Sequence, residues 1–214
     1  MKNGLFITFE GPDGAGKSTQ IKKLTDFLMK KDFDTLLTRE PGGTAIGEKI
    51  RELVLDREYT EMDPVTEAML YAASRAQHVA EVIKPALEKG KTVICDRFMD
   101  SSIAYQGYGR KLGDRVRIIN EIAVAGLVPD LTILLILNPD ECIRRISSSN
   151  MDRLEMEEID YHRDVYKGYI ELARMHPDRI IPINGSGDIE EISLEIIGKT
   201  EKIIREKGAI NGKE

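Results

Sequence analysis

Cysteine is scarce in this chain of 214 residues, which contains two, Cys95 and Cys142. Cys95 lies in an apolar run and Cys142 in a predicted helix, so the pair provides neither a disulfide framework nor the ligand spacing of a metal site. Long apolar runs are missing as well, because no stretch approaches the roughly 18 residues that a membrane-spanning helix needs. The apolar run near the N-terminus, about six residues, is too short for a signal peptide. We therefore expect a cytoplasmic protein with reduced thiols and no membrane partner.

An excess of positive charge is also absent. The chain has 31 lysines and arginines against 37 aspartates and glutamates, a formal net charge of −6. A protein whose main partner is a nucleic-acid polymer normally carries a basic face, so this balance argues against such a partner and still allows a local basic pocket. The chain is 41% apolar and 32% charged, and it lacks repeats, low-complexity tracts and shifts in composition. Residues 1–214 are therefore predicted to form a single soluble domain.

Short apolar runs alternate with longer segments of helical period. The predicted strands are Leu5–Phe9, Thr35–Thr38, Thr92–Cys95, Leu131–Leu137 and Ile180–Ile183. The predicted helices are Lys17–Lys31, Ile46–Leu55, Pro64–Ala73, Ala76–Lys89, Asp114–Ala125, Pro139–Ser147, Glu157–Met175 and Ile189–Lys207. Such alternation is typical of βαβ units, so we expect an α/β fold with a five-stranded parallel sheet and helices on both faces.

A glycine-rich segment, GPDGAGKST, joins the first predicted strand to the first predicted helix. It matches the phosphate-binding pattern G-x-x-x-x-G-K-[ST] in the strand–loop–helix context that the pattern requires. Lys17 is expected to reach the β- and γ-phosphates of a nucleotide, and the Ser18 hydroxyl is expected to bind Mg²⁺. The predicted nucleotide-binding residues are Gly11, Pro12, Asp13, Gly14, Ala15, Gly16, Lys17, Ser18 and Thr19.

Asp13 places a carboxylate in the middle of this loop. Two unit charges about 4 Å apart repel by about 4 kcal/mol at an effective dielectric constant near 20, so a carboxylate facing a triphosphate would be unfavourable. One interpretation is that Asp13 caps the following helix. The other is that it contacts a second substrate or a cation that accompanies that substrate.

Arginines follow the second and third predicted strands. Arg39 ends the second strand, Arg51 lies on the next helix, and Asp96 and Arg97 end the third strand. Ligands of parallel sheets bind at the carboxyl ends of the strands, so the three arginines are expected to converge there, either on the phosphate of an acceptor or in surface ion pairs. Asp96 is predicted to organise magnesium together with Ser18.

Five segments together identify a family. The segments GPDGAGKST, TREPGGT, LYAASRAQH, DRFMDSSIAYQG and PDLTILL resemble thymidylate kinases, and the resemblance runs from Phe6 to about Ile204. It implies the P-loop nucleoside-monophosphate-kinase fold and transfer of the γ-phosphoryl group of ATP to dTMP, giving dTDP, with Mg²⁺ as cofactor. It also implies a homodimer.

The resemblance assigns residues to dTMP. Asp13 matches a carboxylate near the sugar 3′-hydroxyl, Arg51 and Arg97 match arginines that grip the acceptor phosphate, and Arg39 belongs to the same strand-end motif. The other predicted dTMP-binding residues are Tyr71, which would stack on thymine, Arg75 and Ser102, which would address the base, Tyr105, which would lie under the deoxyribose, and its neighbour Gln106.

The resemblance also locates the cation that stabilises the transferred phosphoryl group. In this family the cation follows the loop carboxylate or comes from a lid, and Gly14 follows Asp13 here. The expected source is Arg153, in a lid segment at about residues 147–158, so the predicted catalytic set is Asp13, Lys17, Asp96, Arg97 and Arg153. The lid departs from the family pattern, because Ser147-Ser148-Ser149 replaces further basic residues; Arg144 and Arg145 lie upstream. The adenine is expected near Asn184-Gly185-Ser186-Gly187.

Two other functions remain open at this point. One is another nucleoside or nucleoside-monophosphate kinase of the same architecture. The other, from a different class, is a regulatory P-loop NTPase switch that signals through a partner protein.

Overall fold

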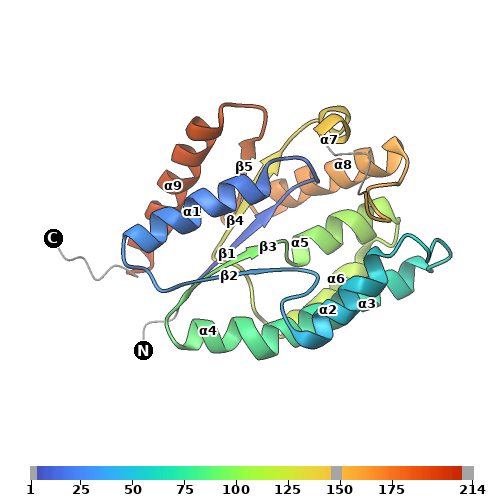
Figure 1. Cartoon of the computed structure of the whole chain (residues 1–214), viewed down its shortest axis with the longest axis horizontal. Coiled ribbons are helices and arrows are strands. Elements are labelled where there is room, and N and C mark those ends of the chain that lie inside the picture. The colour runs from blue at the N-terminus through green and yellow to red at the C-terminus, as the bar shows by residue number, and fades with distance from the viewer. Residues whose placement is uncertain (1–3, 146–150, 209–214) are drawn as a thin grey trace.

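Five parallel strands form one sheet in the computed structural model, which describes residues 4–145 and 151–208. The strands are β1 (Leu5–Glu10), β2 (Thr35–Arg39), β3 (Thr92–Asp96), β4 (Leu131–Ile136) and β5 (Ile180–Asn184). Their spatial order is β2-β3-β1-β4-β5, with helices crossing over on both faces (Figure 1). The sequence prediction of a five-stranded parallel α/β sheet is confirmed.

Helical segments connect these strands. The α-helices are α1 (Lys17–Lys30), α2 (Ala45–Leu55), α3 (Pro64–His78), α4 (Lys84–Glu88), α5 (Met99–Ser102), α6 (Asp114–Val124), α7 (Pro139–Arg145), α8 (Ile159–Met175) and α9 (Ile189–Glu206), and wider π-helical turns span Val79–Ile83 and Ile103–Gly109. The last residues of the helix predicted at Pro139–Ser147 and the segment Ser147-Ser148-Ser149 lie outside the described residues.

Two helix predictions need correction. The predicted break between Ala73 and Ala76 is wrong, because α3, the π-helical turn and α4 follow one another without interruption from Pro64 to Glu88. The intervening Ser74 and Arg75 are buried and bonded to neighbouring segments, so tertiary contacts favour a continuous helix there. The helical stretch Met99–Gly109 was not predicted, since its mixture of serine, glycine and tyrosine has no clear helical period.

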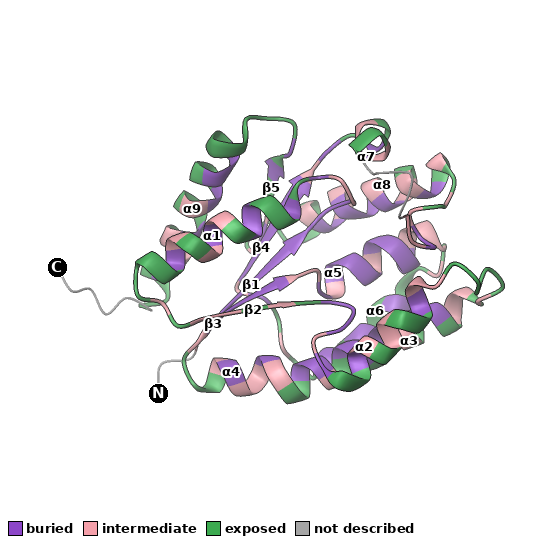
Figure 2. Ribbon diagram, in the orientation of Figure 1, coloured by how far each residue is buried: buried purple, intermediate pink, exposed green. Residues whose placement is uncertain are grey.

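The sheet is buried between two layers of helices. On one face, Leu5, Ile7 and Phe9 of β1 pack in a cluster with residues of α1 and α9. On the other face, Phe6 packs with residues of β3 and of the turn that follows α3. In Figure 2 the central strands β1, β3 and β4 are almost entirely buried, whereas the edge strands β2 and β5 are more exposed, and exposed positions lie on the outer sides of the helices. A central strand that is apolar on both faces is what a covered parallel sheet requires.

The carboxyl ends of the strands meet at one end of the molecule, where the strand arrows of Figure 1 point. The loops after β1, β2 and β3 lie side by side there, because β1 and β2 both pair with β3 in register. The phosphate loop, Arg39 and Arg97 therefore come to the same edge of the sheet. Among the described residues, no helix is both long and apolar enough to cross a lipid bilayer.

Candidate active site

The phosphate loop between β1 and α1 is built on glycines with left-handed backbone. Gly11, Gly14 and Gly16 have φ angles of 129°, 78° and 93°, which side-chain-bearing residues rarely adopt. A Cβ atom on Gly11 would lie 2.3 Å from the carbonyl oxygen of Leu135, and one on Gly14 would lie 2.8 Å from that of Cys142. The close approach of α7 leaves no room for a side chain at position 14. The position directly after Asp13 therefore does not supply a cation.

Lys17 folds back over this loop. Its Nζ donates hydrogen bonds to the carbonyl oxygens of Gly11 and Pro12, at 3.0 and 2.9 Å, and lies 3.7 Å from Asp13. Burial lowers the pKa of Lys17, and the Arg97 charge lowers it further, while the Asp13 carboxylate raises it. The ammonium therefore lies where an anion held by the loop would contact it.

Asp13 turns away from the loop and toward β3. Its Oδ1 accepts a hydrogen bond from Arg97 Nη2 at 2.5 Å, and its Oδ2 accepts one from the Tyr105 hydroxyl at 3.0 Å. Burial raises the pKa of Asp13, but the charges of Arg97 and Lys17 outweigh it and hold that pKa well below its usual range. The Asp13 carboxylate is thus ionised and bonded to Arg97 and Tyr105. No side chain caps the N-terminus of α1. The helix-cap interpretation of Asp13 is wrong.

Arg97 is held in place from several sides. Its Nη1 donates to the carbonyl oxygen of Gly11 and to the hydroxyls of Ser101 and Tyr169, at 2.9 to 3.1 Å. Its backbone has a φ of 66°, a left-handed conformation that is costly for arginine. Strain of this kind persists only where the surroundings fix the residue, so the fold holds this guanidinium in one position.

Glu10 bonds to two of the residues that hold Arg97. Its carboxylate accepts hydrogen bonds from the Phe98 backbone N–H at 2.8 Å, the Tyr169 hydroxyl at 3.3 Å and the Ser101 hydroxyl. Ser101 and Tyr169 in turn contact Arg97. Burial, together with the Asp100 charge, raises the pKa of Glu10 to about 7. Arg97 is therefore held through Ser101 and Tyr169 by a buried carboxyl group whose pKa lies near neutrality.

This pKa predicts how stability depends on pH. Because the pKa of Glu10 is higher in the folded state, folding retains a proton between about pH 4.5 and about 7, and the free energy of unfolding should fall as the pH rises through that window. Glu10→Gln removes the titration, so the variant should lose less stability than the wild type between about pH 5 and about pH 8. Urea denaturation at both pH values measures the difference, and equal losses in the two proteins would contradict it.

A cavity opens between Arg97 and the helices α2 and α3, and we call it the inner cavity. It is lined by Asp13, Glu40, Pro41, Arg51, Leu55, Tyr71, Arg75, Arg97, Ser101, Ser102, Tyr105, Gln106, Asp152 and Leu154. The fold brings together here eight of the nine residues that the sequence assigned to the second substrate. The ninth, Arg39, is half exposed and paired with Glu48 at 2.9 Å, outside this cavity.

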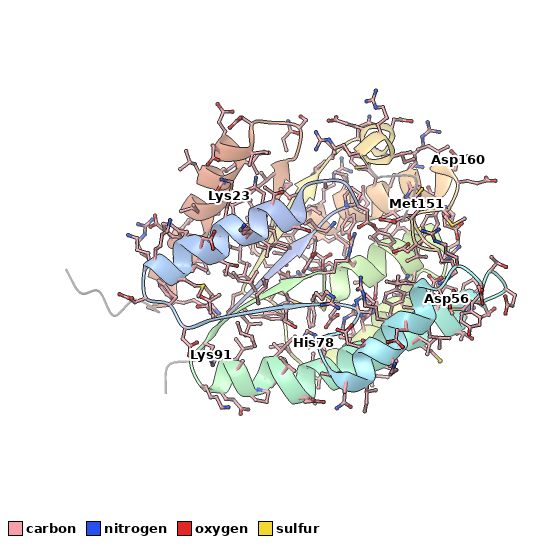
Figure 3. The ribbon with its side chains drawn as sticks, in the orientation of Figure 1. Lys23, Asp56, His78, Lys91, Met151 and Asp160 are labelled. Atoms are coloured by element: carbon pink, nitrogen blue, oxygen red, sulfur yellow. The ribbon has the colours of Figure 1, made fainter. Side chains whose placement is uncertain are left out.

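Arg75 is a buried side chain of the inner cavity that is held by four partners. It donates to Glu40 at 2.7 Å, to Ser102 at 2.9 Å, to the Phe98 carbonyl oxygen at 3.0 Å and to Asn120. A guanidinium has five N–H donors, so at most one remains for a ligand. Glu40 also accepts from His78, which Figure 3 labels on α3 below the sheet.

A second cavity, the phosphate-loop cavity, adjoins the first at Asp13 and Arg97. It is lined by Asp13, Gly14, Gly16, Lys17, Ser18, Thr19, Arg39, Glu40, Arg51, Asp96, Arg97 and Arg145. The convergence of Arg39, Arg51 and Arg97 predicted from the sequence is therefore observed. Arg145, at the end of α7, donates to Glu141 at 2.5 Å and to the Gly185 carbonyl oxygen at 3.3 Å. This arginine was only noted in the sequence, and the structure adds it to the cavity.

The phosphate-loop cavity suits a hydrated divalent cation. Asp96 Oδ1 is buried and has no hydrogen-bond partner within residues 4–145 and 151–208, and the Ser18 side chain lines the same cavity. Carboxylate and hydroxyl oxygens are the ligands that Mg²⁺ prefers. The residues present thus fit the ion predicted from the sequence.

Arg153 lies away from the phosphate loop. Its guanidinium donates to Glu67 at 2.6 Å and to the Val54 carbonyl oxygen at 3.1 and 3.2 Å, and 7% of the side chain is exposed. Within the described part of the chain, the lining of neither cavity includes Arg153, although its neighbours Asp152 and Leu154 line the inner cavity. The structure therefore does not bring the predicted lid arginine to Lys17.

Sequence reasoning missed several polar residues of the site. Ser101 lay within a quoted segment, and Glu10 could have been found as an acid that directly follows a buried strand. Tyr169 and Glu67 carry no comparable signal, because each lies within an amphipathic helix where any half-buried polar residue would look the same.

Comparisons with known proteins agree over nearly the whole chain. The family model described as thymidylate kinase matches residues 9–196. The thymidylate kinase of Exiguobacterium sp. (strain ATCC BAA-1283 / AT1b) is 48% identical over 208 residues, which is 96% of this chain and 98% of that protein. That of Geobacillus sp. (strain WCH70) is 50% identical over 193 residues, 88% of this chain and 92% of that protein. The crystal structure of thymidylate kinase from Ehrlichia chaffeensis superimposes with a TM-score of 0.76 at 32% identity, over 93% of this chain and 99% of that one.

Proposed function

This chain belongs to the thymidylate kinase family of phosphotransferases, and on that premise we propose that it transfers the γ-phosphoryl group of ATP to dTMP, giving ADP and dTDP. The observation that carries the proposal is the junction of the two cavities at Asp13 and Arg97. A phosphate loop on one side and a cavity lined by arginines and tyrosines on the other suit a donor triphosphate facing a nucleoside monophosphate.

We assign the inner cavity to dTMP. Arg97 and Arg51, which line both cavities, would hold the acceptor phosphate by charge-assisted hydrogen bonds. Tyr71 would stack on thymine, and Arg75 would offer its remaining N–H to the base beside Ser102. Tyr105, whose hydroxyl is fixed by Asp13, would lie under the deoxyribose, with Gln106 beside it and Arg39 at the entrance of the phosphate-loop cavity.

We assign the phosphate-loop cavity to ATP. Residues Gly11 to Thr19 would surround its phosphates, with Lys17 at the β- and γ-phosphates. Ser18 and Asp96 would hold Mg²⁺, which when bound supplies positive charge to the transferred phosphoryl group. The acceptor oxygen of dTMP is already ionised at neutral pH, so the residues need only align it and neutralise charge, and no general base is required.

A coupled assay of ADP release tests this function. With dTMP, dUMP, dGMP, dCMP, AMP and thymidine offered separately, dTMP should give the highest kcat/KM, and little ATP should be hydrolysed without an acceptor. Preference for another acceptor would refute the proposal in favour of a different nucleotide kinase. Acceptor-independent ATP turnover would favour an NTPase switch.

We further propose that the protein is a single-domain homodimer of the cytoplasm. Exposed apolar side chains support the dimer: Met69 lies on α3, Leu53 on α2, and Ile118 and Ile122 on α6. These three helices pack side by side at the bottom of the view in Figure 2, where exposed and buried positions alternate along them. Light scattering after gel filtration should give twice the chain mass of 24.1 kDa, and a single chain mass would refute the dimer.

A further inference from the structure

Glu67 is a buried carboxylate that accepts hydrogen bonds from two other segments: Gln106 and Arg110 at the end of the π-helical turn Ile103–Gly109, and Arg153 further along the chain. Glu67 lies on α3 and is 0% exposed. Its Oε1 accepts from Gln106 at 2.9 Å, and its Oε2 accepts from Arg110 at 3.1 Å and from Arg153 at 2.6 Å. Glu67 does not line the inner cavity, but its partner Gln106 does.

Arg153 holds the segment that precedes α8 against this carboxylate. Besides the pair with Glu67, it donates two hydrogen bonds to the Val54 carbonyl oxygen at the end of α2, and its backbone N–H lies 3.4 Å from the carbonyl oxygen of Leu55. Figure 3 shows the labelled Met151 and Asp56, the neighbours of these contacts, at the same end of the molecule. The segment is thus fastened to both α2 and α3.

The residues on either side of Arg153 form part of the inner cavity. Asp152 and Leu154 line it together with Tyr71 and Arg97. Asp152 is itself fixed, because its Oδ1 accepts from the backbone N–H groups of Leu154 and Glu155 at 2.9 Å. Asp152 and Leu154 form one wall of the inner cavity, and their position depends on where Arg153 is held.

Electrostatics favours keeping Arg153 at Glu67. A carboxylate without exposure to water is costly unless its charge is compensated, and removing one partner of a buried ion pair is strongly unfavourable. Moving Arg153 to the phosphate loop would withdraw one of two guanidinium groups from Glu67. Arg145 already lines the phosphate-loop cavity, and 39% of its side chain is exposed.

We propose that Glu67 is a positioning residue for the acceptor: through Arg153 it fixes Asp152 and Leu154 as a wall of the inner cavity. Arg153 then acts on the acceptor side, and Arg145 is the cation next to the donor. The inference rests on the proposed function, since it takes dTMP as the occupant of the inner cavity.

Steady-state kinetics with dTMP and ATP varied separately test the proposal on the full-length enzyme. Arg153→Ala and Glu67→Gln should each raise the KM for dTMP by about tenfold or more, with kcat and the KM for ATP changed by less than about threefold. Arg153→Lys keeps the charge and should recover part of the affinity. The double variant should be little worse than the more affected single variant, because both changes break the same contact.

Two comparison variants make the result specific. Arg163→Ala removes a half-exposed arginine near the start of α8 and should leave all three constants unchanged. Arg145→Ala should instead lower kcat or raise the KM for ATP. If Glu67→Gln does not fold, as judged by circular dichroism, Arg153→Ala and Arg153→Lys decide the question alone.

Three results would overturn the inference. A fall in kcat for Arg153→Ala with an unchanged KM for dTMP would place this arginine at the transferred phosphoryl group. Additive effects of the two substitutions would show that Glu67 does not act through Arg153. Unchanged kinetics in variants of an enzyme that phosphorylates dTMP would refute the inference alone, whereas a wild type inactive on dTMP would refute the proposed function and this inference with it.

Discussion

Replacement of Arg97 by alanine is expected to lower kcat/KM for dTMP by about a thousandfold or more. Arg97 lies where the two cavities meet, and it also pairs with Asp13 at 2.5 Å. The substitution therefore removes the cation proposed for the acceptor phosphate and leaves the partly buried Asp13 carboxylate without its main partner. Initial rates at several dTMP concentrations measure the loss.

Two controls separate this effect from misfolding. Arg179→Ala breaks another arginine–aspartate pair, the one between Arg179 and Asp100. Among the described residues, Arg179 is not part of the lining of either cavity. It should cost stability and leave most of the activity. Thermal denaturation shows how far each variant remains folded. An Arg97→Ala enzyme that stays folded and keeps most of its dTMP kinase activity would exclude acceptor-phosphate binding by this residue.

Lys17→Ala is expected to lower kcat by about a hundred- to a thousandfold, since it removes the cation that the loop presents to the transferred phosphoryl group. In the structure the ammonium is bonded to two loop carbonyl oxygens, and a bound triphosphate offers it more strongly charged partners. Single-turnover measurements with saturating dTMP report the loss directly.

The neighbouring Lys22 provides a matched control on the same helix. Lys22 lines neither of the two cavities within the described ranges, so Lys22→Ala should retain nearly the full rate. Equal rate losses in both variants would mean that Lys17 acts only through the net charge of α1. An unchanged kcat with a raised KM for ATP would restrict Lys17 to ground-state binding.

Much of the fold could be predicted because its signals are local. Each predicted strand overlaps an observed one, since apolar runs of four to seven residues between helical segments leave few alternatives. The errors lie where distant contacts decide. Ser74 and Arg75 form part of one continuous helix because the segment after β2 and residues of α5 and α6 bond to them. The residues next to Ser74 and Arg75 in the sequence do not predict these contacts.

The candidate site divides in the same way. The phosphate loop and the strand-end arginines could be predicted, because a loop pattern and the ends of parallel strands specify positions in the fold. The partners of those residues could not. The family resemblance implied that Arg153 would act at the phosphate loop, but it pairs with Glu67, 86 positions earlier.

The α/β sheet, the family and the phosphate loop follow from the amino-acid sequence alone, because periodicity and motifs a few residues long specify them. The contacts of Asp13 and Arg153 depend on the folded chain. Asp13 meets Arg97, 84 positions later, and Glu10 meets Tyr169 across 159 positions. Buried charges select partners by distance in space, and only the folded chain sets that distance.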